Sequence, residues 1–267
     1  YGMAECSLAI SFADVDQPLT ITSIDGEELA NNNRAVPFDQ GCAHREANFI
    51  DCGRVLPDHD IEIRDQNDRS LPERAIGVIH VRGPSVMSHY FDNTEETENT
   101  LKNGWLNTGD IGFLINGRIH ITGREKDLII INGRNIWPQD LEHLAEQQPE
   151  IRTGDALAFS APDFNGATTV VVVMQCRERN EKNRADIVAR VEAAIKEEIG
   201  VNCFIKLVPP HTLPRTSSGK LSRSAARRDY MEQNNVSESF VSEPPNTSVS
   251  TSCLLYTSDA ADELSCV

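Results

Sequence analysis

The chain has 267 residues, with 25 Lys and Arg against 41 Asp and Glu, which gives a formal net charge of −16 at pH 7. This balance argues against nucleic-acid binding, because a protein needs a cationic surface to neutralise phosphates. Hydrophobic residues make up 39% of the chain, enough for a core, which argues against full-length disorder and against a fibrous rod.

Apolar runs and cysteines bear on the cellular compartment. The longest purely apolar runs, 170–174 and 128–131, are far too short to cross a bilayer, so we expect no membrane span. The seven cysteines include no Cys-x-x-Cys pair, and their odd number does not favour a secreted disulfide framework. We therefore expect a cytoplasmic protein. The chain opens on Tyr1 in mid-pattern, which suggests a fragment.

The first 123 residues have the pattern of β-structure. Residues 61–65 and 78–82 alternate with period two. Residues 111–115 and 118–122 flank Asn116-Gly117, a pair that tolerates the positive φ angles of a hairpin turn. Between Phe12 and Asn48 the pattern dissolves, and we expect a long loop or an inserted excursion there.

The next hundred residues alternate strands and helices, as in a compact α+β domain. A second hairpin is expected around Asn132-Gly133. The further predicted elements are a helix from Pro138 to about Gln148, strands at 156–160, 168–175 and 203–208, and a helix at 184–199.

The helix at 184–199 carries an apolar stripe of Ile187, Val191, Ile195 and Ile199. Asn183 is its expected N-cap, and Gly200 is the expected C′ residue. From Glu232 the chain is rich in Ser, Thr, Asn and Pro, and we expect 232–267 to be a disordered tail whose end is non-native.

Three charged positions are candidates for chemistry. Asp110 follows Gly109 at a strand start, where a carboxylate could accept hydrogen bonds from two ribose hydroxyls. A turn aspartate bonded to its own backbone is the more common explanation of this segment alone. Arg124 and Lys126 lie in a charged stretch that is either a solvated linker or a hinge.

Lys220 ends a Ser- and Gly-containing loop within a locally cationic region that includes Arg215, Arg223, Arg227 and Arg228. Such a surplus suggests an anionic partner, although a solvated basic helix face has the same pattern. The loop lacks Gly-x-x-x-x-Gly-Lys spacing, so it is not a P-loop.

Five segments in order resemble the adenylate-forming superfamily, the enzymes that activate carboxylates with ATP. They cover the chain from Tyr1 to about Met231. The segments are 1–5 (YGMAE), 77–84 (GVIHVRGP), 104–110 (GWLNTGD), 123–135 (GREKDLIIINGRN) and 214–221 (PRTSSGKL). The first segment, the stretch 135–142 and the excursion between Phe12 and Asn48 are most similar to fatty-acyl-AMP ligases, which pass the acyl group to an acyl carrier protein.

The resemblance implies a fold of mixed α/β and α+β class. Residues 1–123 would form the β-rich C-terminal end of the large AMP-binding domain, and 124–231 the small α+β C-terminal domain. The phosphate loop of the family lies upstream of the first motif and is not in this sequence. We therefore expect the fragment itself to be inactive.

The resemblance also implies roles for individual residues. Tyr1 and Gly2 would bind the nucleotide, with Tyr1 beside the adenine, and Glu5 would bind Mg²⁺. Asp110 would hold the ribose hydroxyls with support from Arg124. Lys126 would be the hinge, and Lys220 would be the catalytic lysine of adenylation.

The implied reaction joins a fatty acid to ATP, with release of pyrophosphate, and passes the acyl group to a carrier protein. Two alternatives remain. The sequence could belong to an acyl-CoA synthetase, or it could be a non-catalytic module that binds a carrier protein through its basic surface.

Overall fold

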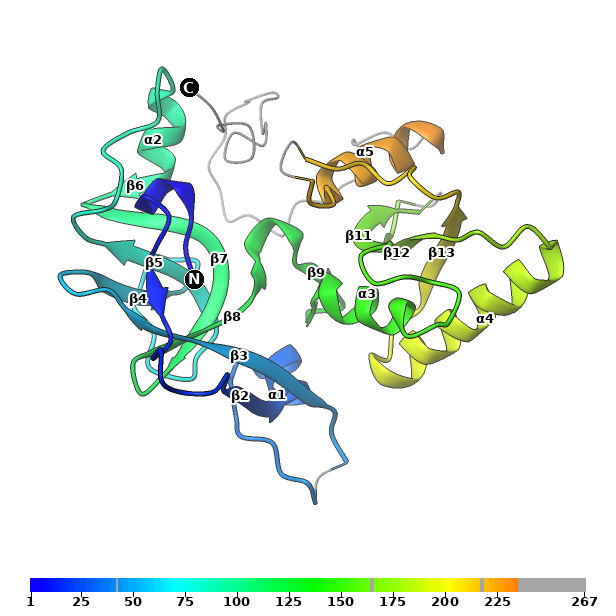
Figure 1. The fold of residues 1–267 in the computed structure, drawn as a ribbon, viewed down its shortest axis with the longest axis horizontal. Helices are drawn as coiled ribbons and strands as arrows, with labels where there is room; N and C mark the ends of the chain where they lie inside the picture. Colours follow the sequence, from blue (N-terminus) through cyan, green and yellow to red (C-terminus); the bar gives the residue numbers. More distant parts are fainter. Residues whose placement is uncertain (42, 164–165, 217–218, 235–267) are drawn as a thin grey trace. The chain divides into compact units, whose positions relative to one another are not determined.

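Residues 1–41, 43–163, 166–216 and 219–234 are described by the computed structural model of the chain (Figure 1). They fall into two units, unit 1 from Tyr1 to Trp137 and unit 2 from Pro138 onward. The tail predicted from Glu232 lies, from residue 235, outside the described residues. None of the described helices is long and apolar enough to cross a membrane.

Unit 1 is built on one sheet with the strand order β1-β3-β8-β7-β5-β4, to which β2 adds at β3 and β6 at β7. Its strands are β1 (Ser11–Phe12), β2 (Ile21–Asp25), β3 (Glu46–Val55), β4 (Asp60–Arg64), β5 (Gly77–Arg82), β6 (Leu101–Lys102), β7 (Trp105–Ile115) and β8 (Arg118–Arg124). Its helical segments are η1 (Ala4–Cys6), α1 (Gly26–Asn32), α2 (Thr94–Thr100) and η2 (Glu125–Asp127). A separate hairpin follows, of β9 (Ile129–Ile131) and β10 (Arg134–Ile136).

Both predicted hairpins are confirmed. Asn116 and Gly117 have φ angles of 52° and 70° between β7 and β8, and Asn132 and Gly133 have 51° and 77° between β9 and β10. These positive angles are the ones that a two-residue turn between twisted strands requires.

The excursion between Phe12 and Asn48 is more regular than the predicted loop. It contains β2 and α1, and Figure 1 shows the long β3 leading from this excursion into the main sheet. The Asp25 carboxylate accepts hydrogen bonds from the amides of Glu27 and Glu28, which caps α1, and Asn33 ends the helix in the left-handed conformation. Ile24 and Leu29 are fully buried and anchor this segment to a core cluster with Phe113.

The contact boundary between the units follows Trp137, whereas the sequence predicts a domain boundary after Gly123. Trp137 is buried in the cluster that contains Phe113, with Leu128 packed against it. The Arg134 guanidinium lies 3.2 Å from the Glu27 carboxylate. The hairpin after β8 therefore packs with unit 1, and the domain boundaries of the family stay a prediction.

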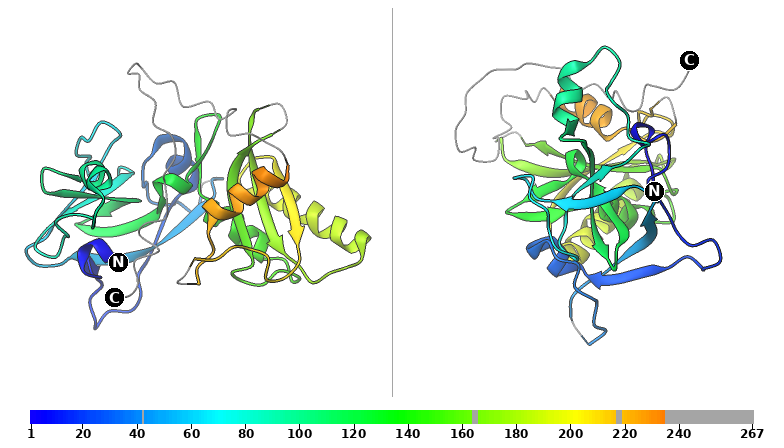
Figure 2. Two further views of the ribbon diagram at one scale, coloured as in Figure 1. Left: turned by 90° about the horizontal axis from the view of Figure 1, so that it is seen from above. Right: turned by 90° about the vertical axis from the view of Figure 1, so that its left-hand side faces the viewer.

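Unit 2 is a three-stranded sheet with helices against it. Its elements are α3 (Pro138–Glu146), β11 (Ala156–Pro162), β12 (Thr168–Gln175), α4 (Glu181–Glu198), β13 (Cys203–Val208) and α5 (Arg223–Gln233). β11 and β12 are antiparallel, β12 and β13 are parallel, and α4 forms the crossover that a parallel pair needs. Figure 2 shows α5 on the opposite side of this sheet from α4.

Successive apolar side chains of β11 and β12 point to opposite faces of this sheet, so both faces are buried. Leu157, Phe159, Val171 and Val173 form one cluster with Ala226 of α5. Neighbouring residues such as Ala158 and Val172 are also fully buried, and alternation directs them to the other face. The mixed α/β fold predicted from the sequence is confirmed.

The apolar stripe predicted for α4 is confirmed, since Ile187, Val191 and Ile195 are at most 1% exposed. Gly200 has the φ angle of 78° expected of a C′ glycine. The N-cap prediction is wrong. Asn180, not Asn183, caps the helix, because its side chain accepts hydrogen bonds from the amides of Lys182 and Asn183.

Candidate functional site

Asp110 lies on β7 with both carboxylate oxygens engaged. Antiparallel pairing of β7 and β8 sets Asp110 opposite Arg124, the last residue of β8. The Arg124 Nε lies 3.3 Å from Asp110 Oδ1, and the Tyr1 hydroxyl donates to Asp110 Oδ2 at 2.6 Å. The structure therefore brings together three residues that the sequence analysis assigned to the nucleotide.

The backbone around Asp110 is fixed by its neighbours. The Thr108 hydroxyl donates to the Ile79 carbonyl at 2.8 Å and accepts from the Asp110 amide at 3.1 Å. Gly109 has a φ angle of 67°, and a Cβ placed there would meet no atom within 4 Å. Glycine thus suits this position because the backbone φ angle is positive, and the space beside it is open.

Burial dominates the electrostatics of Asp110. Desolvation raises the pKa of its carboxyl group, and this outweighs the opposing effects of the Tyr1 hydrogen bond and the Arg124 charge. Desolvation likewise raises the pKa of the Tyr1 phenol, and the adjacent Asp110 carboxylate raises it further. Tyr1 therefore stays a hydrogen-bond donor.

Gly2 allows the chain to turn tightly after Tyr1. A Cβ at Gly2 would lie 1.7 Å from the Leu8 carbonyl oxygen, so no side chain fits there. The turn carries Glu5 in η1, where this residue is only 6% exposed. The Tyr90 hydroxyl donates to Glu5 Oε1 at 3.0 Å, and the Met87 amide donates to the Glu5 carbonyl at 2.8 Å.

Glu5 offers one carboxylate to a divalent cation. No group of three or more His, Cys, Asp and Glu side chains that could enclose a metal occurs among the residues described. Mg²⁺ commonly takes one or two protein carboxylates and completes its shell with water and substrate phosphates. A single buried carboxylate held by Tyr90 fits that mode of binding.

The predicted hinge residue Lys126 is exposed in η2, which continues directly from β8. The Leu128 amide donates to the Arg124 carbonyl at 3.1 Å and closes this turn. Only Glu125 separates Arg124 from Lys126.

Lys220 lies in unit 2 and is exposed at the end of a loop that hydrogen bonds between Thr216 and Lys220 close. Thr216 donates its amide to the Lys220 carbonyl at 2.8 Å, and its hydroxyl accepts from the Lys220 amide at 3.2 Å. Arg215 donates to the Gly219 carbonyl at 2.8 Å. The ends of the loop are therefore fixed, while residues 217 and 218 lie outside the described residues.

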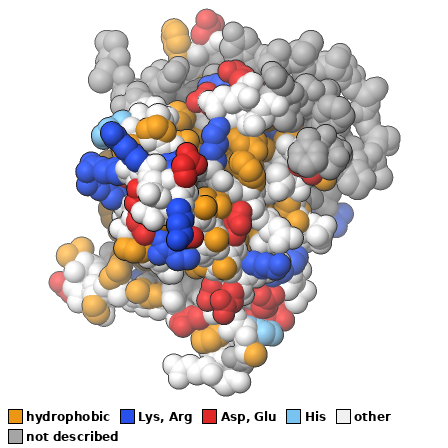
Figure 3. All heavy atoms as spheres, turned by 90° about the vertical axis from the view of Figure 1, so that its right-hand side faces the viewer, with side chains coloured by type: hydrophobic (Ala, Val, Ile, Leu, Met, Phe, Trp, Pro, Cys, Tyr) orange, Lys and Arg blue, Asp and Glu red, His pale blue; other side chains and the backbone are white. Residues whose placement is uncertain are grey.

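The cationic region around Lys220 is partly committed to internal contacts. Arg223 forms a two-point pair with Glu142, with hydrogen bonds of 2.9 and 2.7 Å. Arg227 donates to the Ser160 carbonyl at 2.9 Å. Figure 3 shows basic and acidic side chains interspersed on the face that it presents. The internal contacts of Arg223 and Arg227 weaken the case for a basic surface dedicated to an anionic partner.

Two residues that the sequence analysis did not select contribute to these sites, Tyr90 and Thr108. Tyr90 is 85 positions from Glu5 in sequence, and no local pattern could have linked them. Thr108 lies in the 104–110 segment, two residues before Asp110. A threonine at this spacing can accept a hydrogen bond from the later amide, so the sequence offered a local signal for this contact.

Known proteins are similar to this chain over most of its length. Residues 133–228 match the model of the AMP-binding enzyme C-terminal domain. A putative acyl-CoA synthetase of Caulobacter vibrioides is 48% identical over 233 residues, which are 86% of this chain and 40% of that protein. JamA of Moorena producens, named a medium-chain-fatty-acid–[acyl-carrier-protein] ligase, is 31% identical over 87% of this chain and 41% of its own length.

Among solved structures, one from a study of fatty acyl-adenylate ligases of E. coli and L. pneumophila superposes with a TM-score of 0.82. Its identity is 41%, over 89% of this chain and 42% of the solved one. This chain therefore spans about 40% of the length of the relatives that it matches.

Proposed function

Because this chain belongs to the adenylate-forming, AMP-binding superfamily, we propose that it supplies the ribose-binding carboxylate and the adenylating lysine of an ATP-dependent fatty-acid ligase. The observation that carries the proposal is the contact of Tyr1 and Arg124 with Asp110. The whole protein would convert a fatty acid and ATP into acyl-adenylate and pyrophosphate.

Asp110 can hold a ribose without losing its present partners. A carboxylate offers about four lone-pair sites, and Tyr1 and Arg124 take two of them. Two vicinal hydroxyls could donate to the sites that remain. The open space beside Gly109 leaves room for the approach of a ligand.

The chemical step requires two anions to meet, so its barrier is largely electrostatic. The substrate carboxylate attacks the α-phosphorus of ATP, and pyrophosphate leaves. In this proposal the Lys220 ammonium neutralises charge on the non-bridging oxygens. Glu5 would hold Mg²⁺, which supplies further neutralisation of the phosphates when bound. A lysine on a loop suits a charge delivered by rotation at Lys126.

The proposed acceptor of the acyl group is an acyl carrier protein. The likeness to JamA and to a fatty acyl-adenylate ligase structure supports this choice. The Caulobacter relative, called a putative acyl-CoA synthetase, keeps coenzyme A as the second candidate. A non-catalytic carrier-binding module is less favoured, since such a module needs no buried Asp110 site.

The test joins residues 1–234 to the preceding part of the Caulobacter relative and measures pyrophosphate release with fatty acid and ATP. Lys220→Ala should lower turnover about 100- to 1,000-fold, the usual effect of losing one preorganised charge. Lys182→Ala, at an exposed position of α4, is the matched control and should keep full activity.

Full adenylation by the Lys220→Ala protein would reject the catalytic assignment. Products formed with coenzyme A and with holo-carrier protein then distinguish the two acceptors. The 267-residue chain alone should release no pyrophosphate.

A further inference from the structure

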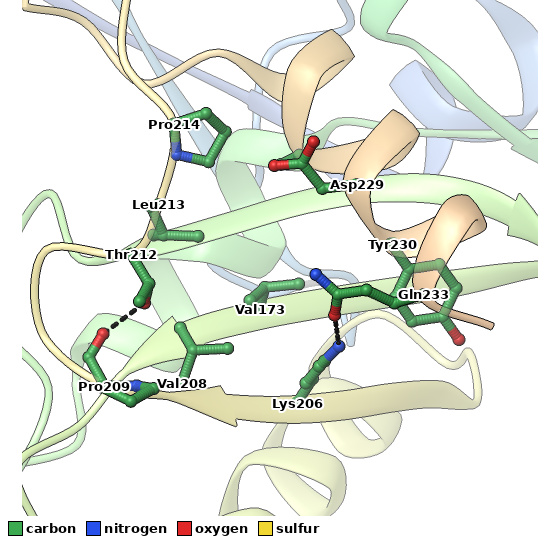
Figure 4. A pocket seen from close by; sticks show the side chains of 11 residues that line it. Val173, Lys206, Val208, Pro209, Thr212, Leu213, Pro214, Asp229, Tyr230 and Gln233 are labelled. Carbon is green, nitrogen blue, oxygen red and sulfur yellow. Dashed lines mark hydrogen bonds between the residues drawn. The ribbon is translucent and has the colours of Figure 1, made fainter.

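One hollow in unit 2 that has no assigned role lies between its sheet and α5. It has a volume of about 250 Å³ and is lined by Val173 of β12, Lys206 and Val208 of β13, the segment from Pro209 to Pro214, and one face of α5 (Figure 4). All of these residues belong to unit 2, so the hollow does not depend on any neighbouring domain.

The walls of this hollow combine apolar and polar side chains. Val173, Val208, Leu213 and Ala226 line it together with the Tyr230 ring. A hollow of this size, partly open to solvent, accommodates a small molecule with a short apolar body.

Two sets of hydrogen-bond donors meet at one end of the hollow. The Lys206 ammonium donates to Gln233 Oε1 at 2.7 Å and lies 5.6 Å from the Tyr230 ring centre. Lysine has three donor hydrogens, and Lys206 forms no ion pair with a carboxylate among the described residues. Figure 4 shows the Gln233 amide nitrogen directed over Val173.

The opposite end of the hollow carries a negative charge. Figure 4 shows the Asp229 carboxylate on the α5 wall near Pro214, away from Lys206. A second anionic group in a ligand would be repelled there, whereas one anionic group beside Lys206 and Gln233 would be matched by donors. The arrangement therefore selects a ligand with a single carboxylate.

We propose that this hollow is a binding site for a small amphipathic monocarboxylate, with its carboxylate on Lys206 and Gln233 and its apolar body over Val173 and Leu213. Thr212, Leu213 and Pro214 line the hollow and lead into the loop that ends at Lys220. The amides of Thr212 and Leu213 donate to Gln175 Oε1 at 3.0 and 3.3 Å, and the Ser222 amide donates to the Pro214 carbonyl at 3.0 Å. The apolar body of the bound ligand would therefore contact Leu213, in the segment that leads to Lys220.

The test uses the 267-residue chain without ATP, so it is independent of the proposed ligase activity. Hexanoate is titrated against the ¹⁵N-labelled protein, with hexanol as the neutral control of similar size. Saturable shifts should appear at the amides of Lys206, Leu213 and Tyr230, and hexanoate should bind at least tenfold more tightly than hexanol. Lys206→Met should remove that preference, whereas Lys196→Met, on the surface of α4, should keep it.

Equal affinity for hexanoate and hexanol would overturn the proposal, because the charged end would then contribute nothing. Hexanoate shifts confined to residues outside the lining, or no saturation, would also overturn it. If Lys206→Met does not fold, the comparison of the two ligands on the unaltered chain decides.

Discussion

Replacing Glu142 by Ala should destabilise unit 2 by about 2–3 kcal/mol, because its carboxylate ties three elements together. The two hydrogen bonds from Arg223 of α5 reach this residue of α3, and the Ala158 amide of β11 donates to it at 2.9 Å. The side chains of Arg223 and Glu142 are 22% and 14% exposed, so truncation removes two hydrogen bonds from a largely buried guanidinium. Complete burial would cost about 3–5 kcal/mol, and partial solvent access lowers that figure.

A matched control exists in the same unit. Glu150 pairs with Arg190 at 2.7 Å, but their side chains are 35% and 45% exposed. Glu150→Ala makes the same change of charge and should lower stability by less than about 1 kcal/mol. The contrast between the two variants isolates the contribution of burial.

Urea unfolding followed by two probes makes this comparison. Both tryptophans, Trp105 and Trp137, lie in unit 1, so their fluorescence follows that unit. Far-UV circular dichroism follows mainly α3, α4 and α5, the longest helices of the described chain. Glu142→Ala should shift the dichroism transition and leave the fluorescence transition in place. Equal destabilisation by the two variants, within about 0.5 kcal/mol, would refute the reasoning.

Three further predictions concern unit 1, with tryptophan fluorescence in urea as the measurement. Gly109→Ala should lower its stability by about 1–2 kcal/mol, because the φ angle of 67° strains an L-residue, whereas Gly41→Ala should have little effect; equal losses would contradict this. Thr108→Val should lower stability by about 1–3 kcal/mol, since the buried Asp110 amide loses its acceptor, and Thr20→Val at an exposed position is the control. The hydrogen bond to Asp25 raises the pKa of His44, so its contribution is present below about pH 6.5 and disappears as pH rises through the higher folded-state value. His44→Ala should remove that pH dependence, and its persistence in the variant would assign it to another group.

Local patterns predicted the elements whose causes are local. Asn-Gly pairs determined both hairpin turns, and the Ile187 stripe identified α4, because turn angles and helical period are properties of neighbouring residues. The helix α1 also had a local signal, since Asp25 precedes two acidic residues as an N-cap does, and the polar composition around it obscured that signal.

Contacts between residues far apart in sequence could be predicted only in part. The motif order led to Tyr1, Asp110 and Arg124, but their joint hydrogen bonding depends on the register of β7 with β8 and on the path of η1. The support of Glu5 by Tyr90 comes from folding of a loop onto η1, which no periodicity records. The placement of Asn180 rather than Asn183 as the cap shows the ordinary uncertainty of helix ends.

The pair Asp110 and Arg124, at the end of the paired strands β7 and β8, lies close in sequence to the proposed hinge. Arg124 contacts Asp110 from that pair, and Lys126 follows Arg124 by two residues. If the chain rotates at Lys126, as proposed, the contact between Arg124 and Asp110, the proposed ribose-binding carboxylate, is the first one that the rotation would disturb. Under the proposed function, rotation of the lysine-bearing unit would then be coupled to how firmly Asp110 is held in place.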